Sequence, residues 1–401
     1  MNDPFDVIVV GAGPAGSVAA WHASLGGAKV LLLEKDRDIG LPVRCAEGVG
    51  AAGLQTVIEP EPKWIASEIT ALNLISPHKK TVTLKNVGLG YVLYRKIFDN
   101  FLAEKAAHAG TEVLTKAYAN GLLFDAEGAV NGVSFTHLGK RFSLRAKVVI
   151  GADGVESRVG RWAGIHTQLK LRDIETCVQY TLANVDVNPG VCDFYFSHEI
   201  APGGYVWVFP KGPGVANVGL GISGEYAEHK SPLRYLNAFV QEHFPKGSIL
   251  TTTVGGVPVA PTNKVIVKDG FMLVGDAAHQ ANPISGGGIV PAMVAGKIAG
   301  QVAAEAVGTG RTSAKFLKTY EKEWYKAQGN THKMTYRLKE AVYRLTDEDL
   351  NRTADSILAL PEEKRTIVNV FKKALYNKPT LILDALRVFK DRIGDIFEPL
   401  S

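Results

Sequence analysis

Three nearly continuous apolar runs, each ending at a glycine or an acidic residue, mark the cofactor-binding part of the chain. They are Phe5–Val10 (FDVIVV), 28–33 (AKVLLL) and 147–150 (KVVI). Such runs are typical of parallel strands that are buried on both faces of a sheet. Between the first two runs, Pro14–Leu25 carries the small and apolar residues of a helix that packs on a sheet. The pattern therefore predicts a strand–helix–strand unit and an α/β fold.

The middle of the chain follows a different pattern, in which short apolar segments alternate with turns. Candidate strands cover residues 176–182, 194–197, 204–209 and 216–222, and we expect further strands within 69–84. Strands joined by turns are typical of an antiparallel sheet. From residue 312 on, the pattern becomes helical and rich in charge.

These changes of pattern predict three parts. We expect a Rossmann-like α/β domain, an inserted antiparallel-sheet domain that holds the substrate, and a helical C-terminal region, which makes the whole chain α+β. Their predicted extents are residues 1–60, 90–165 and 262–311 for the first part, 61–89 and 166–261 for the second, and 312–401 for the third. A chain of 401 residues is long for one core, which agrees with such a division.

Composition narrows the class of protein without indicating a reaction. Hydrophobic residues make up 46% of the chain and charged residues 21%, which is ordinary for a globular protein. No apolar stretch reaches the ~20 residues that span a bilayer, and the N-terminus enters a strand pattern without a signal peptide. Three cysteines are too few for a disulfide framework, and the ten histidines lack paired ligand spacing. We therefore expect a cytoplasmic protein without a metal site.

The net charge of +5 permits association with anionic lipids. A stripe of Lys and Arg interleaved with aromatic residues, the usual sign of nucleic-acid binding, does not occur in the sequence. We therefore expect no nucleic-acid partner.

A glycine motif joins the first strand to the first helix. Gly11-Ala-Gly-Pro-Ala-Gly16 matches GxGxxG in the strand–turn–helix context that gives this motif its mechanism. Gly11 permits a tight turn, Gly13 lets the backbone approach a pyrophosphate, and Gly16 lets helix and strand pack closely. The pyrophosphate then faces the helix N-terminus near Ala15. Glu34, at the end of the second strand, is placed to accept hydrogen bonds from the adenosine ribose.

A second motif, Gly151-Ala-Asp-Gly154, follows the strand at 147–150 and precedes a helix start near Ser157. In this position Asp153 can meet a phosphate-side water and the ribityl chain of a flavin nucleotide. Without other information, the same residues also fit an ordinary capped turn.

A third motif combines an aspartate with a glycine-rich helix start. Asp276 follows the apolar run at 271–274 and is placed to bind a ribityl hydroxyl. A glycine triplet then opens a long helix over 289–307. The free N–H groups and the positive dipole of this helix start would stabilise the negative charge of a reduced flavin. The residues at the helix start are Gly287, Gly288 and Ile289.

In this order, the three motifs resemble the para-hydroxybenzoate-hydroxylase-type FAD fold, in which GxGxxG, a DG motif and a GD motif follow one another. The resemblance implies FAD as the cofactor. It also implies that Arg95 lies near the flavin and the pyrophosphate, and that the backbone of Ala119 meets the adenine. From the residues alone, Arg95 also fits a solvated helix-cap arginine. A second strand–GxGxxG–helix unit does not follow, so we expect an external electron donor, either ferredoxin or NAD(P)H.

An aromatic segment in the middle part distinguishes between reaction types. Tyr205, Trp207 and Phe209 alternate with valines, so their side chains share one face of a strand. By itself this pattern predicts a packed core face. The segment 202–210 (PGGYVWVFP) resembles the Y-x-W-x-F-P motif of the geranylgeranyl reductase family, which lies beside the isoprenoid substrate. The resemblance extends from Phe5 to about residue 307.

Residues 43–48 (VRCAEG) resemble a cysteine-containing loop of the same family. The cofactor contacts that this resemblance implies are Arg44, Cys45, Ala46 and Gly48. Cys45 either tunes the flavin through its thiol or contributes only backbone, and we favour the second role. We interpret Cys177 and Cys192 as packed, inert residues. A further GxGxxG match at 48–53 lacks a preceding strand, so we interpret it as a chance match to the fingerprint, and a glycine-rich loop near the cofactor stays open as an alternative.

The family resemblance implies an FAD-dependent reductase that saturates C=C bonds of geranylgeranyl chains by hydride transfer from reduced FAD. Its archaeal members imply digeranylgeranylglycerophospholipids as the substrates, in the synthesis of membrane lipids. Water, the flavin and Tyr205 are candidate proton donors, and we expect His279 to shape the flavin loop. Two alternatives stay open: an aromatic-type FAD monooxygenase, and an electron-transfer flavoprotein that acts on quinone. The second alternative usually needs an iron–sulfur centre, for which three unclustered cysteines give no ligand set.

The end of the chain contains an apolar stripe within 379–397. Its members are Ile382, Leu386, Phe389, Ile393 and Phe397. A helix with such a stripe either covers a domain core or lies on an anionic membrane surface. We favour packing on the core, and we expect any membrane association to be peripheral, at the inner face of the cell membrane.

Overall fold

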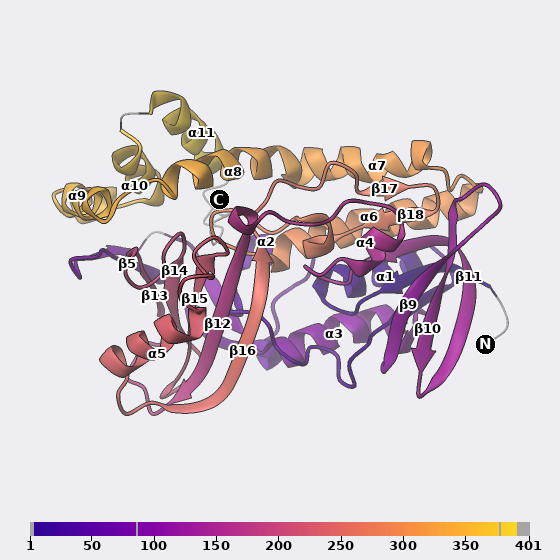
Figure 1. Ribbon diagram of the computed structural model, residues 1–401, viewed down its shortest axis with the longest axis horizontal. Helices are drawn as coiled ribbons and strands as arrows, with labels where there is room; N and C mark the ends of the chain where they lie inside the picture. Colours follow the sequence, from indigo (N-terminus) through magenta and orange to yellow (C-terminus); the bar gives the residue numbers. More distant parts are fainter. Residues whose placement is uncertain (1–3, 86, 377, 391–401) are drawn as a thin grey trace.

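The computed structural model describes residues 4–85, 87–376 and 378–390. Figure 1 shows an elongated molecule with one large sheet toward each end and the C-terminal helices lying above the sheet that contains β12 to β16. The two sheets correspond to the two patterns in the sequence, and the space between them contains the candidate site.

The first sheet has eight strands and is parallel at its centre. Its main order is β17 (Val267–Lys268), β18 (Phe271–Leu273), β11 (Lys140–Gly151), β1 (Phe5–Val10), β2 (Val30–Leu33) and β8 (Glu112–Leu114). Strands β9 (Ala117–Phe124) and β10 (Val130–His137) extend β11 in antiparallel fashion. The predicted strands therefore exist, although β2 begins at Val30 rather than at residue 28. The antiparallel extension was not predicted.

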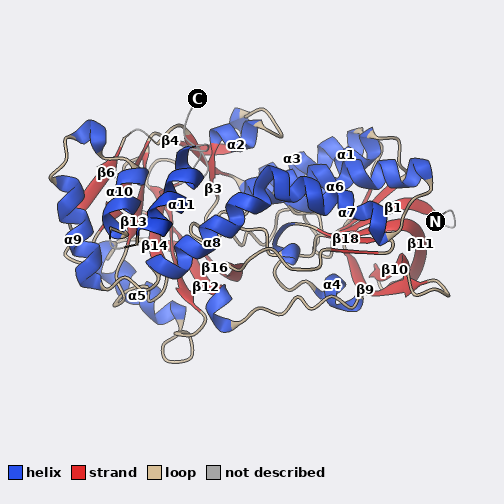
Figure 2. Ribbon diagram, turned by 90° about the horizontal axis from the view of Figure 1, so that it is seen from above, coloured by secondary structure: helices blue, strands red, loops and turns tan. Residues whose placement is uncertain are grey.

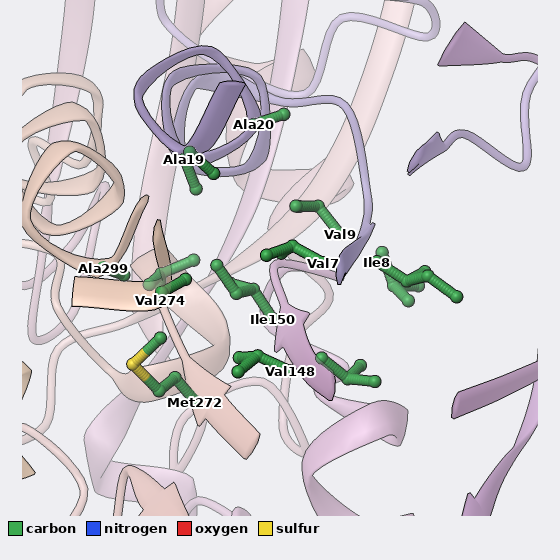
Figure 3. Close-up of a cluster of buried hydrophobic side chains, with 14 of the residues drawn as sticks. Val7, Ile8, Val9, Ala19, Ala20, Val148, Ile150, Met272, Val274 and Ala299 are labelled. Carbon is green, nitrogen blue, oxygen red and sulfur yellow. The ribbon is translucent and has the colours of Figure 1, made fainter. Parts of the chain in front are cut away.

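Helices cover this sheet and seal its core. They are α1 (Pro14–Leu25), α3 (Arg95–His108), α4 (Arg158–Trp162), α6 (Ile289–Thr309) and α7 (Ala314–Trp324). Figure 2 shows α1, α3 and α6 side by side, and Figure 3 shows buried Val7, Val9 and Ile150 near Ala19 of α1. Helices α1 and α6 approach closely because Gly296 has no side chain. A Cβ atom at that position would lie only 2.2 Å from the Ala15 carbonyl oxygen. This contact fixes the start of α6 beside the start of α1.

The second sheet has seven strands and is mostly antiparallel. Its order is β16 (Ser248–Pro258), β12 (Ile174–Ala183), β15 (Val215–Ser223), β14 (Tyr205–Pro210), β13 (Val191–Tyr195), β5 (Ala71–Ile75) and β6 (Thr81–Leu84). Only β13 and β5 pair in parallel. The strand expected at 194–197 ends at Tyr195, because the next residues form a turn. The long strand β16 was not predicted.

The two faces of this sheet pack against different helices. Val206 and Val208 of β14 belong to a core with Leu236 and Phe239 of α5 (Pro232–His243). The aromatic face of the same strand belongs to a core with Ile357 of α9 (Asp347–Leu358). The alternation along β14 therefore places its aromatic residues on one face, as predicted.

A small third sheet connects the two large ones. It consists of β3 (Gly48–Gly50), β7 (Gly90–Leu93) and β4 (Ile65–Ile69). Helix α2 (Ala51–Gln55) directly follows β3 in the chain. Strand β3 pairs antiparallel with β7. The GxGxxG match at 48–53 therefore lies outside any parallel strand–helix–strand unit, as expected, but its residues form β3 and the start of α2 rather than a loop.

The C-terminal helices are α8 (Asn330–Val342), α9, α10 (Ile367–Ala374) and α11 (Pro379–Lys390). Tyr320 and Trp324 at the end of α7 are fully buried in the core of the first sheet. Ile382 of α11 packs on the core that α8 and α10 share, which agrees with the packing role. Ile393 and Phe397 lie outside the described residues. No helix within the described ranges is long and apolar enough to cross a membrane.

Candidate active site

Two adjoining cavities lie at the carboxyl ends of the parallel strands, where open α/β sheets bind ligands. The substrate-side cavity has a volume of about 360 Å³ and lies between the start of α6 and the second sheet. The nucleotide-side cavity has a volume of about 380 Å³ and lies over the ends of β1 and β2. Gly13, Arg44, Arg95 and Ala152 line both cavities. The shared lining makes one elongated site.

The geometry of the first glycine motif fits the roles that its spacing predicts. Gly11 has a φ of 105°, and a Cβ atom there would lie 2.4 Å from the Ala152 carbonyl oxygen. A Cβ atom on Gly16 would lie 1.8 Å from the Gly11 carbonyl oxygen, so only glycine allows helix and loop to pack this closely. A Cβ atom on Gly13 would meet nothing within 4 Å, and Ala15 lines the cavity beside it. The open space over Gly13 fits a pyrophosphate at the N-terminus of α1.

Glu34 stands at the end of β2 and lines the nucleotide-side cavity. Its carboxylate accepts hydrogen bonds from the backbone N–H of Ala12 and of Asp36, each at 2.9 Å. These bonds orient both oxygens, each of which has a second lone pair for a ribose hydroxyl. We keep this ribose contact as a prediction.

Asp153 lines the nucleotide-side cavity, and one of its carboxylate oxygens lacks a hydrogen-bond partner within the described ranges. Its Oδ2 accepts from the Val159 N–H at 3.0 Å, which places the aspartate at the start of α4. Its Oδ1 is buried and has no hydrogen-bond partner among the described residues. Burial raises the pKa of this carboxyl, although the backbone hydrogen bond from Val159 opposes the shift. A buried oxygen without a partner fits a position that a ligand hydroxyl or water satisfies.

Arg95 and Ala119 both line the cavities, and their contacts with FAD remain predictions. Arg95 lines both cavities, and its guanidinium makes two 2.7 Å hydrogen bonds with Asp99, one turn along α3. It is therefore a held side chain at the junction of the cavities rather than a solvated cap. Ala119 lines the nucleotide-side cavity from β9, next to Tyr118.

The start of α6 and the loop around Cys45 face the substrate-side cavity. The predicted cofactor residues that line it here are Arg44, Cys45, Ala46, Gly48, Asp276, Gly287, Gly288 and Ile289. Burial raises the pKa of Asp276 to about 6, against the charge of Arg95. Burial also raises the pKa of the Cys45 thiol, whose sulfur accepts the Glu47 N–H at 3.2 Å. A thiol held in its protonated form agrees with the structural role that we favour.

His279 and the other two cysteines differ in their surroundings. The Nε2 of His279 lies 3.1 Å from the Thr167 carbonyl oxygen, so its ring ties the Asp276 turn to the 157–167 segment, as expected. Cys192 is fully buried in the core. Cys177 packs against the same core, as expected, and it also lines the substrate-side cavity. The reason is that β12 turns this side chain toward the cavity opposite the side-chain-free Gly221 of β15.

The aromatic residues Tyr205, Trp207 and Phe209 all line the substrate-side cavity. The indole N–H of Trp207 donates to the side-chain amide oxygen of Gln179, Oε1, at 2.8 Å. The Gln179 amide in turn donates to the Cys45 carbonyl oxygen at 3.1 Å. Gln179 therefore connects the aromatic strand to the cysteine loop. Sequence reasoning missed it because an isolated polar residue in a strand gives no pattern.

Glu47 is a second residue, after Gln179, to which the sequence alone assigns no role. It is 1% exposed, and its carboxylate accepts from Lys211 Nζ, from the Asn217 side-chain amide at 2.6 Å and from the Arg95 backbone N–H at 3.0 Å. These partners come from the second sheet and from α3. Glu47 thus fixes the cysteine loop between the two large sheets.

Comparisons with known proteins identify the family. The model of the FAD-dependent oxidoreductases matches residues 6–191, and the model of the geranylgeranyl reductase catalytic domain matches residues 173–257. The chain is 47% identical over 386 residues to a digeranylgeranylglycerophospholipid reductase of Methanocella arvoryzae, covering 95% of this chain and 98% of that protein. The chain belongs to the digeranylgeranylglycerophospholipid reductase family.

Other relatives agree with this assignment. A second protein of this name, from Methanosarcina acetivorans, is 46% identical over 99% of each chain. A crystal structure of a geranylgeranyl bacteriochlorophyll reductase-like protein from Thermoplasma acidophilum superposes with a TM-score of 0.88 at 37% identity, covering 96% of this chain and 98% of that one. A flavin-dependent brominase, Bmp2, has a TM-score of 0.72 at 18% identity over 96% of this chain and 99% of that one, and shares the fold alone. The chain is therefore an FAD-dependent oxidoreductase of the geranylgeranyl reductase class, and the predicted fold and cofactor are confirmed.

Proposed function

We propose that this chain saturates C=C bonds in the geranylgeranyl chains of digeranylgeranylglycerophospholipids, a step in the synthesis of archaeal membrane lipids. The observation that carries the proposal is the substrate-side cavity, in which the start of α6 and the aromatic face of β14 line the same space. Val178, Val257 and Ile284 add apolar surface to it. An apolar cavity of this kind suits a prenyl chain better than a compact polar molecule.

The residues of the chain fit FAD along both cavities. Gly13 and Asp153 would hold the pyrophosphate and ribityl region, and Asp276 would face the ribityl chain from the other side. Bound FAD in its reduced form supplies a hydride for the alkene. The free N–H groups at the start of α6, near Gly288, stabilise negative charge at the flavin end of the site.

The aromatic face has a separate task, because an unactivated alkene offers no charge to hold. Trp207 and Phe209 are nearly buried and exclude water from the substrate-side cavity. Their shape orients the prenyl chain of the substrate, so that positioning contributes much of the rate enhancement. The hydroxyl of Tyr205 donates to the Ser285 carbonyl oxygen and so links this face to the loop before α6.

We also propose an external electron donor and a peripheral contact with the membrane. Residues 166–261 contribute antiparallel strands rather than a second nucleotide-binding unit, which supports a donor such as ferredoxin or NAD(P)H that binds transiently. Exposed Tyr376 and Leu383 lie on the C-terminal helical region, where they would be available to a lipid surface.

Anaerobic reduction of the purified holoenzyme with dithionite, followed by mass spectrometry of an added geranylgeranyl lipid, tests the proposal. We expect mass gains of whole hydrogen pairs. Two comparison reactions use a quinone under the same conditions, and a phenol with NAD(P)H and oxygen. Reduction of quinone with unchanged lipid supports the electron-transfer alternative, and a hydroxylated phenol with unchanged lipid supports the monooxygenase.

A further inference from the structure

Glu175 is a buried carboxyl group in the substrate-side cavity that the cofactor does not require. It is the second residue of β12, is 7% exposed, and lies between Ser223 of β15 and Val257 of β16. A Cβ atom added to Gly204 would lie 3.1 Å from its Oε2, and one added to Gly221 would lie 3.6 Å from it. Two glycines therefore border this oxygen, beside the aromatic strand.

The two oxygens of Glu175 have different environments. Oε1 accepts a hydrogen bond from the Tyr343 hydroxyl, and Oε2 is buried with no hydrogen-bond partner among the described residues. When this carboxyl is protonated, Tyr343 leaves Oε2 as the oxygen that carries the proton. Glu175 lines the cavity that the substrate would occupy, so the acidic O–H belongs to the wall of that cavity.

The surroundings keep Glu175 available in its acidic form near neutral pH. Burial raises its pKa to about 7, while the hydrogen bond from Tyr343 and the charge of Lys339 act in the opposite direction. Lys339 is fully buried under the rings of Tyr336 and Tyr343, with its Nζ 3.0 Å from the Val259 carbonyl oxygen. This cation would stabilise the carboxylate that remains after a proton is given away.

The other titratable groups in the cavity are poorer acids or are already engaged. Burial raises the pKa of Tyr205, Cys177 and Tyr343 well above their usual ranges. Both ring nitrogens of His332 have partners, the Ala281 carbonyl oxygen at 2.8 Å and the Thr262 hydroxyl at 3.4 Å.

The two remaining carboxyl groups are accounted for elsewhere. Glu47 is held by Lys211, Asn217 and the Arg95 backbone. Asp276 lies at the flavin side, within the field of Arg95. Among the described residues of this cavity, only Glu175 thus combines a pKa of about 7 with a buried carboxyl oxygen that lacks a hydrogen-bond partner beside the aromatic strand.

We propose that Glu175 is the proton donor in the reduction of the alkene. The Oε2–H bond breaks and a C–H bond forms at one alkene carbon, while the other carbon receives the hydride that reduced FAD supplies. The alkene gains two electrons, the flavin loses two, and Glu175 is left as a carboxylate that takes a new proton from solvent. This inference rests on the proposed function, and it assigns to Glu175 the role for which Tyr205 was a candidate.

The test compares the holoenzyme with Glu175→Gln and with Asp193→Asn as a matched control. Asp193 lies in β13 of the same sheet, burial raises its pKa as well, and it accepts from Asn73 at 2.8 Å outside both cavities. The first readout needs no substrate: infrared titration of the carboxylic acid C=O stretch. We expect a band that disappears with a midpoint near pH 7, that Glu175→Gln lacks and that Asp193→Asn retains. A wild-type protein without this band overturns the proposal.

The second readout is the oxidation of dithionite-reduced flavin by a geranylgeranyl lipid in a single anaerobic turnover. General acid catalysis contributes about 10²–10⁴-fold, so we expect Glu175→Gln to be slower by about 100-fold or more and Asp193→Asn to stay within about 3-fold of the wild type. A Glu175→Gln rate that also stays within about 3-fold overturns the proposal. If the wild-type enzyme itself fails to oxidise its flavin with lipid, the reductase function fails, and the infrared titration still judges the acid.

Tyr343→Phe provides a variant that leaves Glu175 in place. Without the Tyr343 hydroxyl, the carboxylate loses a stabilising hydrogen bond and its pKa rises. Because the donor must be protonated, turnover falls as pH rises through this pKa, and we expect that fall to move to higher pH in the variant. A fall at an unchanged pH contradicts the assignment.

Discussion

The buried carboxylates of the two cavities divide into two kinds. Glu47 uses both oxygens on protein partners from the second sheet, its β14–β15 connection and α3, so it holds the scaffold together. Asp153 and Glu175 each use one oxygen on a protein donor and leave the other buried without a partner among the described residues. Because an unsatisfied buried oxygen is costly, it indicates a ligand or a proton at that position. We therefore interpret Glu47 as a structural carboxylate, and we propose that the unpartnered oxygens of Asp153 and Glu175 meet a ligand or carry a proton.

The largest effect expected from this comparison is the loss of stability when Glu47 loses its cation. Lys211→Met leaves the Glu47 carboxylate 1% exposed without its ion-pair partner. Breaking a buried pair in this way costs about 3–5 kcal/mol, so we expect a loss of that size in the free energy of unfolding. Chemical denaturation of the apoprotein measures it. Lys79→Met, which breaks the exposed pair with Glu242, is the control and should change the stability by less than ~1 kcal/mol.

A buried carboxylate with one unpartnered oxygen should instead lower the free energy of unfolding at pH values above its unperturbed pKa. The pKa of Glu175 is about 7 in the folded protein against 4.5 when unperturbed, so the folded state keeps a proton that the unfolded chain loses. Stability therefore falls as pH rises from 4.5 to 7, by ~2–3 kcal/mol for this group. In Glu175→Gln this contribution disappears, and the variant gains stability over the wild type at pH 8 but not at pH 4. Equal differences at both pH values would contradict the shifted pKa.

Glycines give a second contrast, between close packing and open space. Gly16→Ala forces a Cβ atom to 1.8 Å from the Gly11 carbonyl oxygen, and such overpacking costs about 1–3 kcal/mol or more. Gly13→Ala adds a Cβ atom where nothing lies within 4 Å. We expect the midpoint temperature of thermal unfolding of the apoprotein to fall for Gly16→Ala and to change little for Gly13→Ala. We expect both substitutions to weaken FAD binding, measured by fluorescence titration. A Gly13→Ala protein that binds FAD normally would remove the pyrophosphate from this position.

The same contrast explains what the sequence could and could not predict. The motif Gly11–Gly16 acts through backbone conformation and close packing among neighbouring residues. Its spacing in the sequence is therefore enough to predict its position in the fold. The aromatic strand was predictable for the same reason, because alternation along Tyr205–Phe209 decides which face each side chain takes. Glu47, Gln179 and Glu175 are single polar residues, and each has a partner more than a hundred positions away in sequence. No local pattern predicts such contacts.

The smallest expected effect lies at the open oxygen of Asp153. Asp153→Asn keeps the shape of the side chain and an acceptor for the Val159 N–H, but it places an amide where the structure leaves Oδ1 without a partner. If a ribityl hydroxyl or a bridging water satisfies that oxygen, FAD affinity should fall about tenfold, or ~1.4 kcal/mol, with thermal stability of the apoprotein nearly unchanged. Fluorescence titration measures the affinity, with Asp193→Asn as the control outside the cavities. An unchanged affinity would show that an unpaired carboxylate oxygen alone does not mark a cofactor contact, and the distinction between the two kinds of carboxylate would then rest on Glu175.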